Sequence, residues 1–169
     1  YMINESDKEK LYNEWHKELG AAQKKFETLD HPWYQSVMKL LPDLNGKKVL
    51  EIGAGRGDFS IWLAQKYKTA EIIGTDFSHS AIEIAKSKID ESLPNLSFLV
   101  ENAESLSFAN ESFDYIISCE TMEHVFHPQA MANEMYRVLK TGAGFILTTE
   151  NYFNAIYLMW IKTWITGKP

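Results

Sequence analysis

A run of closely spaced glycines, Gly53, Gly55 and Gly57, most constrains the fold of this chain. Residues 48–52 before it are apolar and predict a strand, and residues 58–67 after it predict a helix. A glycine loop between a strand and a helix brings backbone N–H groups and the positive helix end together, where ligand oxygens can bind. The glycine spacing differs from the G-x-G-x-x-G pattern of dinucleotide sites. We therefore expect an α/β protein with a ligand at this loop.

The rest of the chain alternates between short apolar segments and helical patterns, which is typical of a parallel sheet. We predict further strands at 71–75, 96–100, 113–119 and 145–149, with a turn at 141–144 before the last. We predict further helices at 6–26, 32–41, 128–139 and 152–165, and one capped by Ser78 or Ser80. This order predicts a Rossmann-like, doubly wound parallel sheet with helices on both faces, in which the strand at 113–119 is buried on both sides.

Length and composition narrow the function classes. The 169 residues fit a single domain, Cys119 is the only cysteine, and no apolar run reaches the ~20 residues of a membrane span. The formal net charge is -6 with acids and bases interspersed, so a nucleic-acid partner is disfavoured. We expect a cytoplasmic protein without a membrane span.

An acidic residue stands at the end of the second predicted strand. Asp76 follows the glycine loop by about twenty residues, the usual place of a carboxylate that binds ribose hydroxyls. Phe77 beside it could pack on an adenine ring or belong to the core. Both residues are candidates for a nucleoside site.

Five motifs in order resemble those of class I S-adenosylmethionine (SAM) dependent methyltransferases, including the ubiquinone-pathway O-methyltransferases. The segment 49–57 resembles their glycine motif, 74–78 their acidic loop and 102–108 their adenine loop. The segments 112–120 and 137–140 resemble the fourth strand and the turn before the fifth strand. The resemblance extends from about residue 30 to residue 150.

This resemblance implies a SAM site. Gly53, Ala54 and Gly55 would contact the amino-acid part, Asp76 the ribose, and Asn102 and Ala103 the adenine. The other expected cofactor residues are Glu51, Phe77, Glu104 and Cys119, with Cys119 a packing residue rather than a nucleophile. Asn102 replaces the usual Asp and is a neutral acceptor.

A group of acidic and histidine side chains follows the fourth predicted strand. In a helical turn Glu120, Glu123 and His124 would share one side. His124, with Glu123, could act as the catalytic acid–base group, or the three could bind Mg or another divalent cation, as in the metal-dependent relatives with this pattern. The third interpretation is an ordinary solvated turn.

The family resemblance divides the chain into three parts. We expect an N-terminal helical lid at 1–45 with Tyr12, Trp15 and His16, a SAM-binding core at 46–150, and an apolar-aromatic helix at 151–169. The last two strands of the family's seven-stranded sheet are missing from this pattern. A parent protein or partner subunit could supply them.

These features predict an enzyme that transfers a methyl group from SAM to oxygen, nitrogen or carbon of a small molecule. The alternative is a SAM-binding module that is inactive without a partner or a further C-terminal segment. A nicotinamide oxidoreductase is disfavoured by the glycine spacing.

Overall fold

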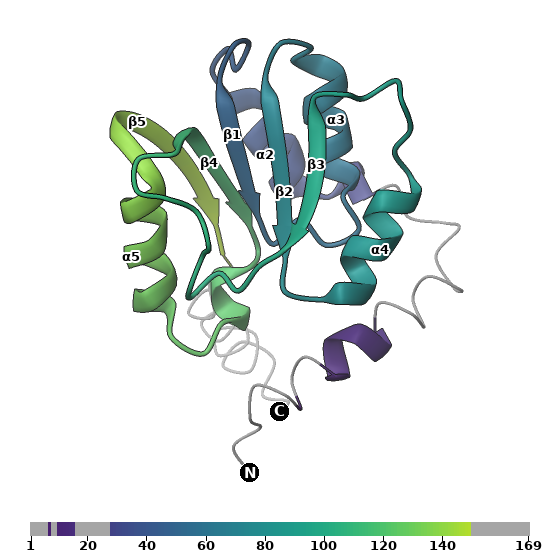
Figure 1. The fold of residues 1–169 in the computed structure, drawn as a ribbon, viewed down its shortest axis with the longest axis vertical. Helices are drawn as coiled ribbons and strands as arrows, with labels where there is room; N and C mark the ends of the chain where they lie inside the picture. The colour runs from purple at the N-terminus through teal and green to yellow at the C-terminus, as the bar shows by residue number, and fades with distance from the viewer. Residues whose placement is uncertain (1–6, 8–9, 16–27, 150–169) are drawn as a thin grey trace, which may run out of the picture.

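The centre of the molecule is a five-stranded parallel sheet (Figure 1). A computed structural model describes residues 7, 10–15 and 28–149. The strands are β1 (Lys48–Ile52), β2 (Glu71–Asp76), β3 (Leu96–Val100), β4 (Phe113–Cys119) and β5 (Leu139–Thr148), in the order β3-β2-β1-β4-β5. The chain changes direction across the sheet between β1 and β4, as in Rossmann-like folds. The predicted fold class is confirmed.

Helices cover both faces of this sheet (Figure 1). The helices α2 (Pro32–Leu40), α3 (Asp58–Lys66) and α4 (His79–Ser87) pack into one apolar cluster, and α5 (Pro128–Val138) packs into the other. Two short 3-10 helices, η1 (Thr28–Asp30) and η2 (Met122–His124), lie in the connections. The sheet is therefore doubly wound, and each α-helix predicted between residues 32 and 139 is present.

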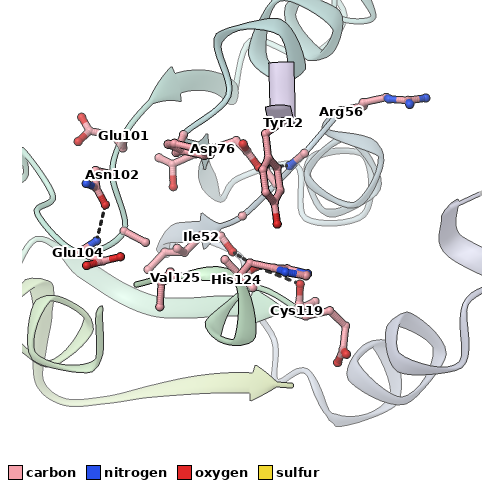
Figure 2. A pocket seen from close by; sticks show the side chains of 18 of the residues that line it. Tyr12, Ile52, Arg56, Asp76, Glu101, Asn102, Glu104, Cys119, His124 and Val125 are labelled. Carbon is pink, nitrogen blue, oxygen red and sulfur yellow. Dashed lines mark hydrogen bonds between the residues drawn. The ribbon is translucent and has the colours of Figure 1, made fainter. Parts of the chain in front are cut away.

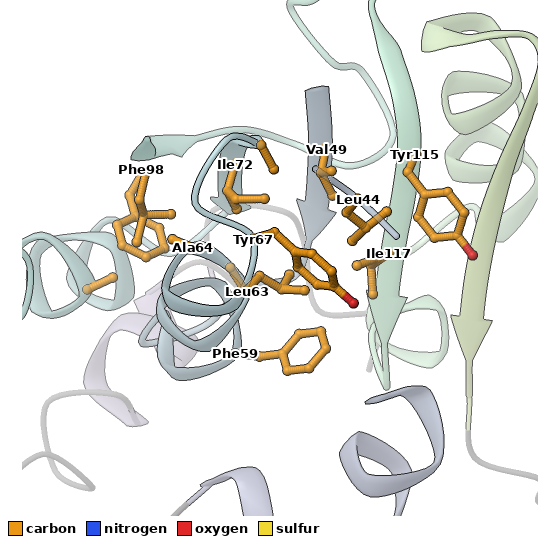
Figure 3. Packing of buried hydrophobic residues seen from close by; sticks show 14 of the residues in the cluster. Leu44, Val49, Phe59, Leu63, Ala64, Tyr67, Ile72, Phe98, Tyr115 and Ile117 are labelled. Carbon is orange, nitrogen blue, oxygen red and sulfur yellow. The ribbon is translucent and has the colours of Figure 1, made fainter. Parts of the chain in front are cut away.

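The fourth strand separates the two cores. Tyr115 and Ile117 contact the cluster under α3, which Figure 3 shows, whereas Phe113 and Ile116 belong to the cluster under α5. All four side chains are buried. The prediction that this strand is buried on both faces is confirmed, and its burial fixes the position of the residues that follow it.

Local signals explain where the helices begin. Pro32 and Pro128 occupy the first turns of α2 and α5, where a missing N–H costs nothing. Of the two candidate caps of α4, Ser78 is the N-cap, and its Oγ accepts a hydrogen bond from the Ala81 N–H at 3.2 Å.

The predicted turn at 141–144 is wrong, because these residues lie within β5. Phe113 pairs with Leu139 and Tyr115 with Gly144, so five steps along β5 match two along β4. The extra residues form a bulge in which Gly142 adopts a φ of 78°. Residues with turn-forming composition are here accommodated inside a strand.

Parts of the sequence predictions concern residues that the structure does not describe. Residues 7 and 10–15 of the predicted first helix are helical, whereas His16 and the predicted helix at 152–165 lie outside the described residues. The two additional strands of the family sheet have no counterpart among residues 28–149. Within the described part of the chain, no helix has the length and apolar character of a membrane span.

Candidate functional site

A cavity of about 470 Å³ opens at the carboxyl ends of the strands (Figure 2). Ile52 at the end of β1, Asp76 at the end of β2 and Cys119 at the end of β4 line it, as do Glu101 to Glu104 after β3. Ligands of open α/β sheets bind at this edge, where the strand order reverses. The cavity therefore lies where the fold predicts a site.

The glycine loop forms one wall of the cavity by close approach of its backbone. Gly53 has a φ of 79°, and a Cβ built on it would lie 2.0 Å from Thr121 Oγ1. Gly53, Ala54 and Gly55, which the sequence predicts to contact a cofactor, line the cavity. Their N–H groups, however, donate to protein acceptors: those of Gly53 and Ala54 to the Thr75 carbonyl at 2.8 Å, and that of Gly55 to Asp76 Oδ2 at 2.9 Å.

This pattern corrects the expectation that the loop amides bind ligand oxygens. The amides stabilise the loop against β2 instead, and the glycines allow the two neighbouring loops to meet without side chains between them. The loop therefore contributes to the cavity by the shape of its backbone.

Asp76 is half-buried at the edge of the cavity, with Phe77 beside it. Besides Gly55, the Ser78 N–H donates to its carboxylate, at 2.9 Å from Oδ1. Burial raises the pKa of Asp76, and the hydrogen bonds from Ser78 and Gly55 oppose that rise. Two backbone donors thus fix the orientation of the carboxylate toward the cavity.

The predicted adenine loop also lies on the cavity. Asn102 Oδ1 accepts the Glu104 N–H at 2.9 Å, which fixes the turn that presents Ala103. Glu104 accepts the Phe126 N–H at 2.6 Å and contacts His127 Nδ1 at 2.7 Å. Burial would raise the pKa of Glu104, but these hydrogen bonds hold it below its ordinary value. Glu104 therefore joins this loop to the segment after η2.

Glu51, a predicted cofactor residue, lies beneath the glycine loop and does not line the cavity. Its side chain is 1% exposed, the Ser60 hydroxyl donates to Oε2, and Oε1 has no hydrogen-bond partner. Burial raises the pKa of Glu51 to about 7. The structure gives this carboxyl a role in joining β1 to α3.

Cys119 lines the cavity at the end of β4. Burial, with a smaller contribution from the charge of Glu51, raises the pKa of its thiol to about 12. The thiol is neutral near pH 7 and is a poor nucleophile.

The residues after β4 differ from the predicted arrangement. Glu120 has a left-handed φ of 50°, and the following turn is the 3-10 helix η2 rather than an α-helix. His124 lines the cavity, with its ring 6.0 Å from that of Tyr12, whereas Glu123 does not line it and accepts the Thr149 hydroxyl at 2.9 Å.

The prediction of a divalent-metal site at Glu120, Glu123 and His124 is therefore not supported. Across the described residues, no three His, Cys, Asp or Glu side chains are grouped so that they could hold a metal ion. The prediction assumed α-helical spacing, and the left-handed residue at 120 removes the basis for it.

Several aromatic residues at the cavity were not predicted as site residues. His31 and Trp33 stack at 4.3 Å, Tyr34 is buried beside them, and all three line the cavity. Burial raises the pKa of Tyr34 well above its ordinary value, so its hydroxyl stays protonated. The sequence signal that could have indicated these site residues is the run of aromatic side chains around Pro32 at the start of α2. Tyr12 and Trp15, predicted as lid residues, also line the cavity.

The charge of the lining is mainly negative. It includes one guanidinium, that of Arg56, and the carboxylates of Asp58, Asp76, Glu101, Glu104 and Glu120. Such a lining favours a ligand that carries positive charge.

Comparison with known proteins identifies the family of this chain. The family described as "Methyltransferase domain" matches residues 49–142, which is more than half of the chain. A demethylmenaquinone methyltransferase of Thermotoga maritima is 29% identical over 143 residues, covering 81% of this chain and 61% of that protein. The chain spans about half the length of the curated relatives that it matches.

Two solved structures share the fold. A methyltransferase in complex with the Haloferax volcanii Trm112 methyltransferase activator has a TM-score of 0.74 and 22% identity, over 96% of this chain and 68% of that one. A SAM-dependent methyltransferase from Aquifex aeolicus has a TM-score of 0.68 and 20% identity, over 80% and 71%. With the family match and the geometry of the cavity, these findings show that the chain belongs to the methyltransferase domain family of class I SAM-dependent methyltransferases.

Proposed function

We propose that this chain binds SAM in the cavity and transfers the methyl group to a small-molecule acceptor. The observation that carries the proposal is the shared lining of the cavity. It brings the glycine loop from β1, Asp76 from β2 and Asn102 with Ala103 after β3 to one place. These segments are distant in sequence and meet because parallel strands end at one edge.

The residues present fit SAM. Asp76 would accept hydrogen bonds from the ribose hydroxyls, and Asn102 and Ala103 would contact the adenine beside Phe77. The carboxylates of the lining suit the positive charge of the cofactor. When bound, SAM supplies a methyl group activated by its positively charged sulfur.

We assign proton removal from the acceptor to His124. Its ring lies at the cavity after β4, and an imidazole nitrogen can accept a proton from a bound acceptor. Glu123, the other predicted catalytic residue, faces Thr149 instead, so we propose a structural role for it. The remaining task of the protein is to align the donor and the acceptor and to exclude water.

The proposed acceptor is a flat ring compound. The stacked His31 and Trp33 rings and the buried Tyr34 lie at the start of α2, which packs in the same cluster as Cys119 of β4. These three rings line the same cavity as Asp76 and Asn102 and give it an aromatic surface. The demethylmenaquinone methyltransferases among the relatives agree with an acceptor of this class.

The alternative function is a SAM-binding module that needs another protein for turnover. One observation supports it: a structural neighbour is in complex with a methyltransferase activator. This alternative predicts SAM binding with no methyl transfer by the chain alone.

The direct test is release of S-adenosylhomocysteine from SAM with a panel of acceptors: phenols, hydroquinones, aromatic amines and aliphatic alcohols. We expect turnover with ring acceptors and none with aliphatic alcohols. Turnover confined to aliphatic acceptors would contradict the acceptor class. Binding of SAM without any turnover would favour the module.

A further inference from the structure

One side chain of the N-terminal helix reaches the start of α4. Asn13, in the helical residues 10–15, accepts two hydrogen bonds through Oδ1: from Ser78 Oγ at 2.7 Å and from the Ser80 N–H at 3.1 Å. We propose that Asn13 is a positioning residue that holds this helix over the cofactor cavity. The inference rests on the proposed function for the identity of the cofactor.

The hydrogen bonds of Asn13 complete the N-terminus of α4. The first N–H groups of a helix lack partners within the helix, and Ser78 satisfies only that of Ala81. Asn13 accepts the N–H of Ser80 and so acts as a second cap from a remote segment. Ser78 and Ser80 are buried, so loss of Asn13 would leave polar groups without partners.

A continuous chain of hydrogen bonds connects Asn13 to the glycine loop. The Ser78 backbone N–H donates to Asp76 Oδ1, and the Gly55 N–H donates to Asp76 Oδ2, each at 2.9 Å. Asp76 is the carboxylate that we assign to the ribose. Ser78 therefore contacts both Asp76, through its backbone N–H, and Asn13, through its hydroxyl, so ligand binding at Asp76 and the position of Asn13 are connected through this one residue.

The neighbours of Asn13 form part of the cavity wall. The Tyr12 ring lies 5.7 Å from Phe77 and 6.0 Å from His124, each edge to face, and Figure 2 shows Tyr12 between Asp76 and His124. Trp15 lines the cavity while 53% exposed, and Leu11 is 54% exposed. Because Leu11 and Trp15, apolar side chains among the described residues of this helix, are largely exposed, the polar contacts of Asn13 are important for its position.

The test compares Asn13→Ala with a matched control, Asn133→Ala. Asn133 accepts a hydrogen bond from Gln129 at 3.0 Å on the exposed face of α5 and does not line the cavity. We expect Asn13→Ala to weaken SAM binding about tenfold, the scale of two lost hydrogen bonds, through faster dissociation. The KM for SAM should rise while kcat at saturating SAM changes less than twofold.

Asn13→Asp keeps an oxygen acceptor and adds a charge that suits a helix N-terminus, so it should restore most of the affinity. Equal SAM affinity of Asn13→Ala and Asn133→Ala would overturn the proposal. So would an Asn13→Asp variant as weak as Asn13→Ala. A lower melting temperature with unchanged SAM affinity would show a purely structural cap and would overturn it too.

Hydrogen exchange separates this inference from the proposed function. Asn13→Ala should increase amide exchange in residues 10–15 and at Ser80, and leave β2 unchanged. If the unaltered chain bound no SAM, the proposed function would fail, and this exchange measurement would still decide whether Asn13 positions the helix. Unchanged exchange would reject the inference.

Discussion

The two rims of the cavity differ in how their residues are held. We call Asp76, Phe77, Asn102 and Ala103 the β2–β3 rim, and Glu120, Thr121 and His124 the β4 rim. Asp76 pairs with Val100 in the parallel register, so the β2–β3 rim is positioned by regular strand geometry. The β4 rim begins with a left-handed residue and continues as a 3-10 helix. Regular strands place residues predictably, and irregular turns do not.

The largest effect that we predict is a loss of turnover without a loss of SAM affinity, caused by a substitution in the β4 rim. His124→Gln should lower kcat about 10²–10⁴-fold, the range for loss of a general base, with SAM affinity within twofold of the unaltered chain. His79→Gln is the control, since His79 lies at the exposed start of α4 and does not line the cavity. Steady-state kinetics and calorimetry provide the two measurements. Normal turnover of the glutamine variant would remove His124 from the mechanism.

Gly53 lies where the two rims meet. Gly53→Ala must place a Cβ 2.0 Å from Thr121 Oγ1 at a φ of 79°, so we expect a loss of about 2–5 kcal/mol, shared between stability and SAM affinity. Gly46→Ala has a similar φ of 71° with no atom within 4 Å, so it should lose stability alone. Thermal melts and SAM titrations of both variants test this. Matching SAM affinities of the two variants would show that the close approach of Gly53 to Thr121 is unimportant for SAM binding.

Glu51 lies beneath the glycine loop and makes the free energy of unfolding depend on pH. Its folded pKa of about 7 exceeds the ordinary 4.5, so its contribution to stability is complete below pH 4.5 and is lost as the pH rises toward 7. Glu51→Gln should therefore gain stability relative to the unaltered chain between these values, by on the order of 3 kcal/mol at most. Chemical unfolding at pH 5 and pH 8 measures the difference. A stability difference that is the same at both pH values would contradict this assignment.

The smallest predicted effect concerns the β2–β3 rim alone. Asn102→Asp replaces a neutral acceptor by a charged one, so SAM binding should tighten by about two- to fivefold. Asn133→Asp, on the exposed face of α5, should leave SAM affinity unchanged. Titration calorimetry resolves this difference. Weaker binding of Asn102→Asp would indicate that residue 102 does not face the adenine amine.

The same contrast explains which parts of the molecule the sequence could predict. The strands β1 to β4 and the helices α2 to α5 follow from apolar periodicity, proline positions and the Ser78 cap, and their predicted bounds agree with the structure to within a few residues. The strand β5 was predicted to begin at residue 145, whereas it begins at Leu139. The β5 bulge was missed because residues 141–144 have turn composition and no local signal distinguishes a turn from a bulge.

The positions of residues at the cavity could likewise be predicted next to regular strands but not in irregular turns. Asp76 ends β2, Asn102 and Ala103 follow closely after β3, and all three line the cavity. The grouping of Glu120, Glu123 and His124 required a helical turn, which the positive φ of Glu120 excludes. The contacts of Asn13 with Ser78 and Ser80 span more than sixty residues, and no pattern in the sequence records them.

The central claim is that the β2–β3 rim holds SAM. Calorimetric titration of SAM into the unaltered chain and into Asp76→Ala tests it most directly, with circular dichroism as the control for folding. We predict one SAM per chain, and binding at least about tenfold weaker in Asp76→Ala because hydrogen bonds to a charged group are lost. No binding to the unaltered chain, or equal binding to a folded Asp76→Ala variant, would contradict the claim.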